Sequence, residues 1–348
     1  MKTILTTPAI TTAVLAALII GAPPLAAAEY TFNQWNAEGI ISSTNWSSGE
    51  APSAGNIYTV AGGRIIQATG NTDLVFAGDT LNMTLGILRF FGNKNLTVND
   101  FRIGGTSAID NTSAGTSVLS GNITHIYTFI PRVTEKISFR TLVNSQLDVA
   151  AKISSPDSGY SDIKFRVIIG ETDNDGKVDI GYCFGVVRFL NGGNDYVGNT
   201  EVINGATLVV GPTGKLGTGD LILKPGMGIG PGSDDDRLRA KTVTLTLENS
   251  AAIESGSALK LYGDETQHVM INLNFTGTSL VSSILVNDVQ QTGSLAEIAA
   301  ALSWLEVTGT GYLDTAPAVP EPATTAALSG ALVLMIASAA AIAARVRK

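Results

Sequence analysis

Apolar and polar residues alternate with a period of two in several segments of the chain. The alternation is clearest at 162–169, 241–249 and 270–277, where every second residue is apolar. A strand has this period when one of its faces is buried and the other meets solvent. Because turn residues bound each segment, we expect half-buried β-strands there, with further short strands at close spacing throughout the chain.

One segment instead predicts an amphipathic helix, "SLAEIAAALSWL" at 294–305. Ser294 and Glu297 have the spacing of a capping box, and Ile298 and Leu302 share one helical face. In a stack of strands this helix would cover the last rung and protect its open edge. An incidental surface helix is the alternative.

Glycine-rich turns separate short apolar strands in "VVRFLNGGNDYVGNTEVINGATLVVGPTGKLGTGDLILKPG", residues 186–226. Glycine tolerates the sharp corners that such a segment needs. Strands and turns that recur in this way predict a β-solenoid with roughly 20–25 residues per rung. The abundance of Gly, Thr, Ser, Asn and Val is typical of an all-β chain.

The same stretch resembles the autotransporter-associated β-strand repeat of bacterial surface proteins. The matching residues are Asn194, Tyr196, Gly198, Thr200, Val202, Gly205, Thr207, Leu208, Val210 and Gly211. The following "GKLGTGDLIL" fits the next rung of the repeat. The resemblance implies a parallel β-helix or a related stack over residues 181–315.

The N-terminal β-rich part, 29–180, is similar to the opening segments of exported proteins that carry this repeat. The residues that carry the similarity are Trp46, Pro52, Tyr58, Phe76, Gly78 and Leu81. The similarity implies that this part belongs to the same stack, and a separate β-sandwich is the alternative. We therefore expect an all-β fold, a parallel β-helix or β-solenoid-like stack, followed by a C-terminal single transmembrane helix.

Residues 1–28 have the parts of a signal peptide. The segment begins with a positive charge, continues with an apolar core over 13–21, and ends in Ala26 and Ala28, small residues that mark a cleavage site before Glu29. The core is short for a membrane anchor, which is the alternative. We expect export by Sec-type machinery and removal of the segment by signal peptidase.

A long apolar run, 323–344, lies near the C-terminus and is followed by Arg345, Arg347 and Lys348. At about 1.5 Å per residue the run spans roughly 33 Å, which is enough to cross the hydrocarbon core of a bilayer. The positive-inside rule keeps the basic end in the cytoplasm. The residues between the signal peptide and the apolar run are therefore expected outside the cytoplasm.

Pro320, Glu321 and Pro322 stand just before this run. The prolines prevent the helix from starting earlier and leave an extended segment at the membrane surface. With the run and the basic end, 316–348 resembles the PEP-CTERM sorting signal of Gram-negative bacteria. The resemblance implies recognition by an exosortase, which is a membrane cysteine transpeptidase, removal of the tail, and an association with exopolysaccharide and biofilm. An ordinary single-span anchor is the alternative.

The charge balance excludes one class of partner. The formal net charge is −8, charged residues make up only 15% of the chain, and Lys and Arg do not cluster in its body. Nucleic acid binding needs such clusters, so we expect no nucleic acid partner. The one cysteine, Cys183, excludes an intramolecular disulfide, and its apolar neighbours predict a buried residue rather than a nucleophile.

An acidic segment has features of a calcium-binding loop. Glu171, Asp173, Asp175 and Asp179 follow the alternate spacing of an EF-hand loop, with Gly176 at its sharp turn. However, a Glu replaces the usual first Asp, and Tyr182 stands where a bidentate Glu is needed. Asn-Asp-Gly is also a strong hairpin signal. A turn between two strands is therefore the preferred interpretation, and we expect no resident metal or other cofactor.

Other candidate chemistry is sparse. Asp234, Asp235 and Asp236 beside Arg237 and Arg239 carry the carboxylates that glycoside hydrolysis uses, but a solvated turn is the preferred interpretation.

The two histidines, His125 and His268, are too few for a zinc cluster. The sequence therefore predicts a non-enzymatic, exported structural or adhesive protein. We expect it first as an inner-membrane-anchored precursor and then at the cell surface or in the extracellular matrix, with polysaccharide as a candidate partner. The alternative is an envelope polysaccharide lyase or hydrolase on a β-helix scaffold.

Overall fold

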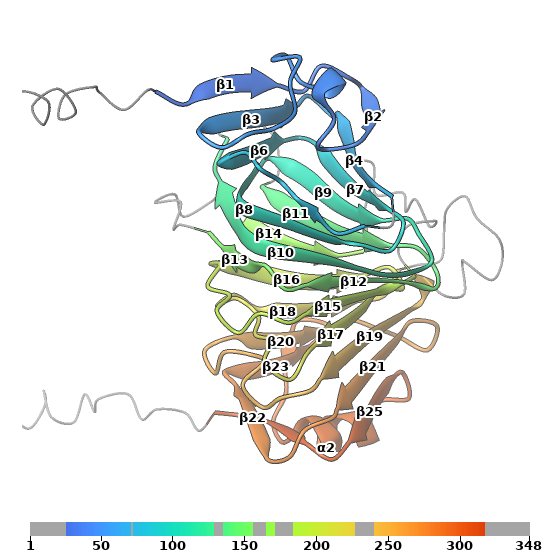
Figure 1. Ribbon diagram of the computed structural model, residues 1–348. Helices are drawn as coiled ribbons and strands as arrows, with labels where there is room; N and C mark the ends of the chain where they lie inside the picture. The colour runs from blue at the N-terminus through green and yellow to red at the C-terminus, as the bar shows by residue number, and fades with distance from the viewer. Residues whose placement is uncertain are drawn as a thin grey trace, which may run out of the picture.

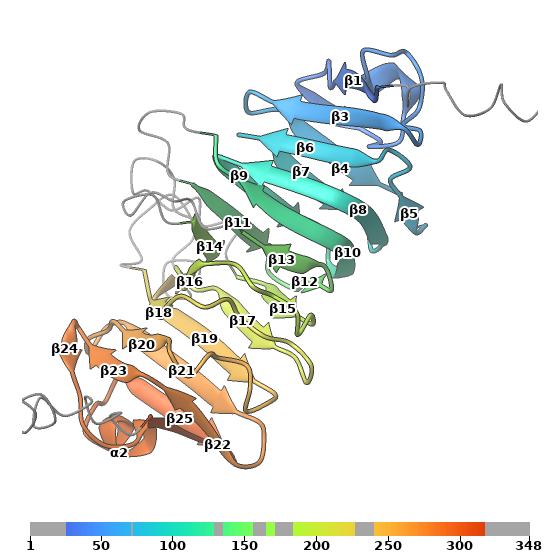
Figure 2. The ribbon, with the colours of Figure 1, turned by 90° about the vertical axis from the view of Figure 1, so that its left-hand side faces the viewer.

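The structure is a computed structural model that describes residues 26–70, 72–128, 135–155, 165–170, 184–226 and 240–316. The described chain winds into an elongated stack of short strands, with β1 at one end and α2 at the other (Figure 1). Two long sheets form this stack and enclose its apolar interior (Figure 2).

The first sheet has 13 described strands. In spatial order its main path is β1 (Ala28–Thr31), β3 (Asn56–Ala61), β6 (Thr80–Thr84), β8 (Asn95–Gly104), β10 (Gly115–Ile126), β12 (Ser145–Val149), β15 (Val186–Phe189), β17 (Thr207–Val210), β19 (Thr242–Leu247), β21 (His268–Leu273) and β25 (Leu305–Gly309). Off this path, β5 (Leu74–Val75) pairs with β8 and β13 (Lys152–Ser154) pairs with β10.

The second sheet has 11 described strands. They are, in order, β2 (Asn36–Glu38), β4 (Ile65–Thr69), β7 (Ile87–Phe91), β9 (Thr106–Asn111), β11 (Lys136–Thr141), β14 (Phe165–Ile169), β16 (Gly198–Ile203), β18 (Leu221–Lys224), β20 (Ala258–Leu261), β23 (Ser283–Val286) and β24 (Val289–Gln290). A third sheet contains β22 (Thr278–Val281) and β26 (Tyr312–Thr315). The helical elements are η1 (Ser43–Asn45) and α2 (Leu295–Ala300).

Successive strands along the chain belong largely to the two long sheets in alternation, so one strand from each sheet makes up a rung. Parallel strands cannot be joined by a tight turn, and here the strand of the opposite sheet lies within each connection. Among the described strands, β23 and β24 pair antiparallel and the other pairs are parallel. The predicted all-β, β-helix-like architecture is therefore confirmed. The N-terminal strands lie in the same two sheets as the repeat at 186–226.

None of the helices that the structure describes has both the length and the hydropathy to cross a membrane. The apolar run at 323–344 lies outside the described residues, so the transmembrane helix stays a prediction.

Apolar side chains fill the interior in rows that run along the stack. One row in the first sheet follows the strand register through Leu147, Val187, Leu208, Leu245, Ile271 and Val307. Burying each such side chain contributes about 1.5–3 kcal/mol, so the rows are the main source of stability. The alternating faces predicted at 165–169, 241–249 and 270–277 are confirmed, because their apolar residues are buried in β14, β19 and at the end of β21.

One sequence prediction needs a correction. A hairpin was expected to follow β14 at the Asn-Asp-Gly turn. The strand has β11 on one edge and β16 on the other, both parallel to it. No edge of β14 is therefore free for an antiparallel partner. The turn itself lies outside the described residues.

The repeat residues at 194–200 have structural roles in this fold. The Asn194 carboxamide accepts a hydrogen bond from the Ile153 N–H at 2.8 Å and donates one to the Lys215 carbonyl at 2.7 Å, so it links three rungs. The buried Tyr196 hydroxyl lies 2.6 Å from Thr200 Oγ1. A Cβ at Gly217 would lie 2.4 Å from the Tyr196 ring, which explains the glycine there.

An aromatic cluster closes the N-terminal end of the stack. The rings of Trp46 and Tyr58 have their centroids 4.9 Å apart, and those of Tyr58 and Phe76 5.5 Å apart, both in edge-to-face geometry. Such pairs stabilise beyond the area they bury. A Cβ at Gly78 would lie 2.6 Å from the Tyr58 ring. Residues that suggested the start of a β-stack in the sequence thus form its buried end.

The helix α2 lies at the other end, within the predicted segment 294–305, but it ends earlier, at Ala300. Ser294 and Glu297 form the reciprocal capping box: the Glu297 N–H donates to Ser294 Oγ, and the Ser294 N–H donates to the Glu297 carboxylate. Leu295 and Ile298 are buried against the last rung. Because the helix is only six residues long, it covers the interior only in part.

Candidate functional site

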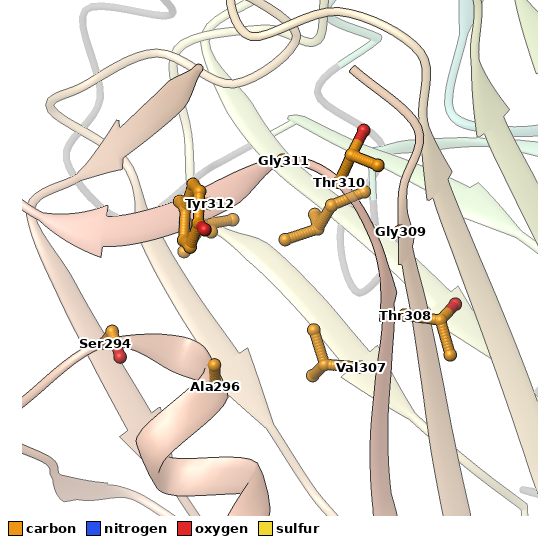
Figure 3. Close-up of a pocket in the computed structure, with 10 residues that line it drawn as sticks. Ser294, Ala296, Val307, Thr308, Gly309, Thr310, Gly311 and Tyr312 are labelled. Carbon is orange, nitrogen blue, oxygen red and sulfur yellow. The ribbon is translucent and has the colours of Figure 1, made fainter. Parts of the chain in front are cut away.

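A pocket of about 420 Å³ lies beside α2, where the interior of the stack reaches its C-terminal surface. Leu273, Val307 and Leu313 supply apolar lining, and Ala296 of α2 lies across from Val307 (Figure 3). The volume falls within the range of small-molecule sites. Within the part of the chain that the structure describes, the pocket thus borders Leu273 and Val307, which belong to the interior rows.

The strand register places a glycine at the end of an interior row beside the pocket. A second interior row runs through Val149, Phe189, Val210, Leu247, Leu273 and Gly309. Gly309 has no side chain at the position where each earlier rung contributes one. Its φ is +100°, and a Cβ would lie 2.3 Å from the Leu273 carbonyl oxygen, so a glycine is required. Leu273 and Gly309 both line the pocket.

The remaining lining is polar but uncharged. Tyr312 lines the pocket, and 64% of its surface is exposed. Thr308 Oγ1 donates to Asn272 Oδ1 at 2.6 Å, and Thr310 Oγ1 donates to the Phe275 carbonyl at 2.9 Å. Each hydroxyl oxygen keeps acceptor capacity for a ligand. The arrangement combines an apolar floor, an aromatic ring and hydroxyl groups, which suits a neutral ligand with one apolar face.

Charged side chains elsewhere in the stack pair between different rungs. Asp110 of β9 is fully buried and is bound by Arg140 of β11 at 2.6 and 2.7 Å. Arg89 of β7 approaches the same carboxylate at 3.3 Å. The Arg166–Glu201 pair at 3.2 Å likewise joins β14 to β16. These pairs hold the register of the strands, since each links groups that only the native alignment brings together.

His125 of β10 is buried in the interior. Its ring stacks on Phe165 with centroids 4.1 Å apart, and its Nε2 lies 3.1 Å from Glu135 Oε2. The Gly105 N–H and the Thr128 N–H and hydroxyl also donate to this carboxylate. His125 Nδ1 is buried without a hydrogen-bond partner. These contacts fit a neutral ring whose Nε2–H donates to Glu135.

Burial lowers the pKa of His125 below its usual 6.5, and the nearby Glu135 carboxylate offsets this only in part. The folded chain therefore binds a proton on this ring more weakly than the unfolded chain. We expect the contribution of His125 to the free energy of unfolding to be fully present above about pH 6.5. It declines as the pH falls below that value and becomes constant again below the folded-state pKa.

Urea unfolding at about pH 8 and about pH 5 measures this dependence. His125→Phe keeps an aromatic ring on Phe165 and should reduce the loss of stability at the lower pH. His268→Gln, at an exposed histidine of β21, is the matched control and should leave the loss unchanged. An equal acid loss in wild type and His125→Phe would contradict the expectation.

Most of the candidate site residues predicted from the sequence lie outside the described residues. They are Pro320, Glu321, Pro322, Arg345, Arg347 and Lys348 of the sorting signal, Glu171, Asp173, Asp175 and Asp179 of the calcium candidate, the acidic turn at 234–239, and Cys183. Ala28 and Glu29 are described, and they begin β1 beside Asn56 and Ile57 of β3. Cleavage between them, which stays a prediction, would leave most of this edge strand in the mature chain.

Sequence reasoning missed the pocket, although its lining includes the distinctive stretch "TGTGY" at 308–312. Within the part of the chain that the structure describes, no three His, Cys, Asp or Glu side chains gather as metal ligands would. Searches found no match to the chain among protein-family models, curated proteins or solved structures. The site is therefore interpreted from its own geometry.

Proposed function

We propose that this chain is an exported structural or adhesive protein of the bacterial surface or extracellular matrix. In this proposal the signal peptide directs export, an exosortase recognises the tail at Pro320, Glu321 and Pro322, and the β-stack is retained in association with exopolysaccharide. The observation that carries the proposal is the long stack itself, closed at one end by aromatic rings and partly covered at the other by α2.

Two properties of the stack suit this role. Several of its ion pairs join different rungs, which favours a rigid spacer over a mobile binding surface. Its first sheet also offers an ordered polar surface: Asn272 Nδ2 donates to Thr246 Oγ1 at 3.1 Å, and Thr308 donates to Asn272 in turn. Hydroxyl and amide groups held in this way are suited to hydrogen bonds with carbohydrate.

The sorting step can be tested in a host that expresses the intact chain. Cells are fractionated into membrane, surface and matrix, and the mass of the mature C-terminus is measured. We expect wild type in the surface or matrix fraction with a shortened C-terminus, and Glu321→Ala held in the membrane with its tail intact. Glu306→Ala, at an exposed acidic residue of β25, is the control and should behave as wild type. If the tail stays attached and all three proteins fractionate alike, the proposal is wrong.

A further inference from the structure

We propose that the pocket beside α2 binds a neutral sugar residue of a polysaccharide, with the Tyr312 ring as the stacking surface. This inference rests on the proposed function and assigns a location and a ligand class to its carbohydrate contact. It begins from the chemistry of the lining. The described lining residues carry no ionisable group other than the Tyr312 phenol, so nothing in the pocket would compensate a buried ligand charge.

Tyr312 gives the pocket an aromatic face. The side chain is 64% exposed and stands over the opening beside Ser294 and Ala296 (Figure 3). A pyranose ring has an apolar face of C–H groups and a periphery of hydroxyl groups. An exposed aromatic ring above an apolar floor of Leu273 and Val307 matches the first of these features.

The backbone of β25 provides the polar partners. The Val269 N–H donates to the Trp304 carbonyl, and the Thr310 N–H donates to the Leu273 carbonyl. In a parallel ladder of this register, the N–H and C=O groups of Val307 and Gly309 point away from β21. Because β25 is the last strand on the path of its sheet, these groups lie along a free edge beside the pocket. They can serve the hydroxyl groups of a sugar as donors and acceptors.

The charges around the pocket favour a neutral sugar over an acidic one. Glu297 and Glu306 are exposed and Asp314 is partly exposed on the segments that contribute the lining. A uronic acid bound there would meet like charges.

The same charges disfavour a second copy of the chain stacked end to end, because the N-terminal end exposes Glu29 and Glu38.

An extended peptide added to the edge of β25 is also less well matched. The free edge beside the pocket offers the backbone groups of Val307 and Gly309, and the chain then turns through Gly311 into β26 (Figure 3). Strand addition draws its affinity from a longer run of main-chain hydrogen bonds. A single ring that contacts an aromatic face and a few polar groups fits the dimensions of the pocket better.

Titration calorimetry of the full chain can test this inference, in a detergent without a sugar headgroup. The probes are neutral gluco-, manno- and galacto-oligosaccharides, with an oligouronate and an extended peptide library as comparisons. We expect a neutral oligosaccharide to bind, and Tyr312→Ala to weaken binding at least about tenfold. Tyr312→Phe keeps the ring and should retain most of the affinity. Ala296→Trp, on the exposed surface of α2, should block the pocket without altering Tyr312.

Trp35→Ala is the matched control, because Trp35 is an exposed aromatic residue that directly precedes β2, at the opposite end of the stack. It should bind as wild type does. Neutral-sugar binding that survives both Tyr312→Ala and Ala296→Trp would overturn the pocket assignment. Preference for the oligouronate, Tyr312-dependent capture of peptides, or no sugar binding would overturn the ligand class. Fractionation of the Glu321→Ala variant reports on the proposed function separately, since it does not depend on this pocket.

Discussion

Replacing Asp110 by Asn is expected to lower the free energy of unfolding by about 3–5 kcal/mol. The carboxylate is fully buried, and both of its oxygens accept hydrogen bonds from Arg140, while Arg89 approaches from the other neighbouring strand. Asn has nearly the same shape but no charge. The substitution would therefore leave the Arg140 guanidinium, which is itself buried, without its bidentate counter-ion.

Urea unfolding followed by circular dichroism measures this loss. Asp100→Asn is the matched control, because the Asp100–Arg102 pair lies within one strand and is partly exposed. Exposed pairs contribute up to about 1 kcal/mol, so the control should unfold close to wild type. Equal losses in the two variants would contradict a stabilising role for the buried network.

If Asp110→Asn does not fold, a double variant decides the matter. Combining it with Arg140→Met removes the buried guanidinium that Asp110→Asn leaves without its carboxylate partner, and an uncompensated buried charge is the main cost of breaking such a pair. The double variant should then recover stability relative to Asp110→Asn alone. Failure to recover would mean that Asp110 acts through contacts other than those with Arg140.

Local patterns predicted individual elements well. The period of two at 241–249 corresponds to β19, and the Ser294–Glu297 spacing corresponds to the capping box of α2. Both signals arise from residues close together in the chain. They depend on local backbone geometry and on the burial of one face, so they can be read before any tertiary contact is known.

The spacing of the rungs could not be predicted in this way. Val187 pairs with Leu208, 21 positions further on, which agrees with the expected repeat. Leu208 then pairs with Leu245, 37 positions further on. The connections between rungs vary in length, while the strands keep their register through side chains in the interior. A repeat length taken from one good copy therefore does not extend along the whole stack.

The candidate site was missed for the same reason. The pocket depends on Gly309 standing in register with Leu273, and a pairing over 36 positions leaves no local signal. The partners of Asp110 are similarly remote, at Arg89 and Arg140. Short-range patterns identify strands and caps, whereas the groups that each rung brings together become visible only when the register is known.

Replacing Trp46 by Ala is expected to cost about 3–5 kcal/mol and to open the N-terminal end of the stack. The indole is 2% exposed, packs against Tyr58, and donates from Nε1 to the Ile40 carbonyl at 3.1 Å. The adjacent Asn45 donates to the Glu38 carbonyl at 2.7 Å, which covers part of the free edge of β2. Loss of the indole would loosen this cover and expose unpaired strand edges to other chains.

Trp35→Ala is again the matched control, because Trp35 lies at the same end of the stack and is 69% exposed. It should change the free energy of unfolding by less than about 0.5 kcal/mol. Urea unfolding measures both losses, and light scattering below the unfolding midpoint should detect association of Trp46→Ala alone. Trp46→Phe keeps a ring but not the Nε1 donor and should fall between the two. If Trp46→Ala is no less stable than Trp35→Ala, the aromatic cluster does not close the stack.

Hydrogen exchange can show how far the damage of Trp46→Ala extends. Each rung contacts mainly its neighbours, so a stack of this kind is stabilised approximately rung by rung. Amides of β3 and β6, next to the cluster, should exchange faster in the variant, while those of β17 and β19 should keep their protection. A uniform loss of protection along the stack would mean that the rungs unfold as one cooperative unit. The N-terminal cluster would then support the whole stack and not only its first rungs.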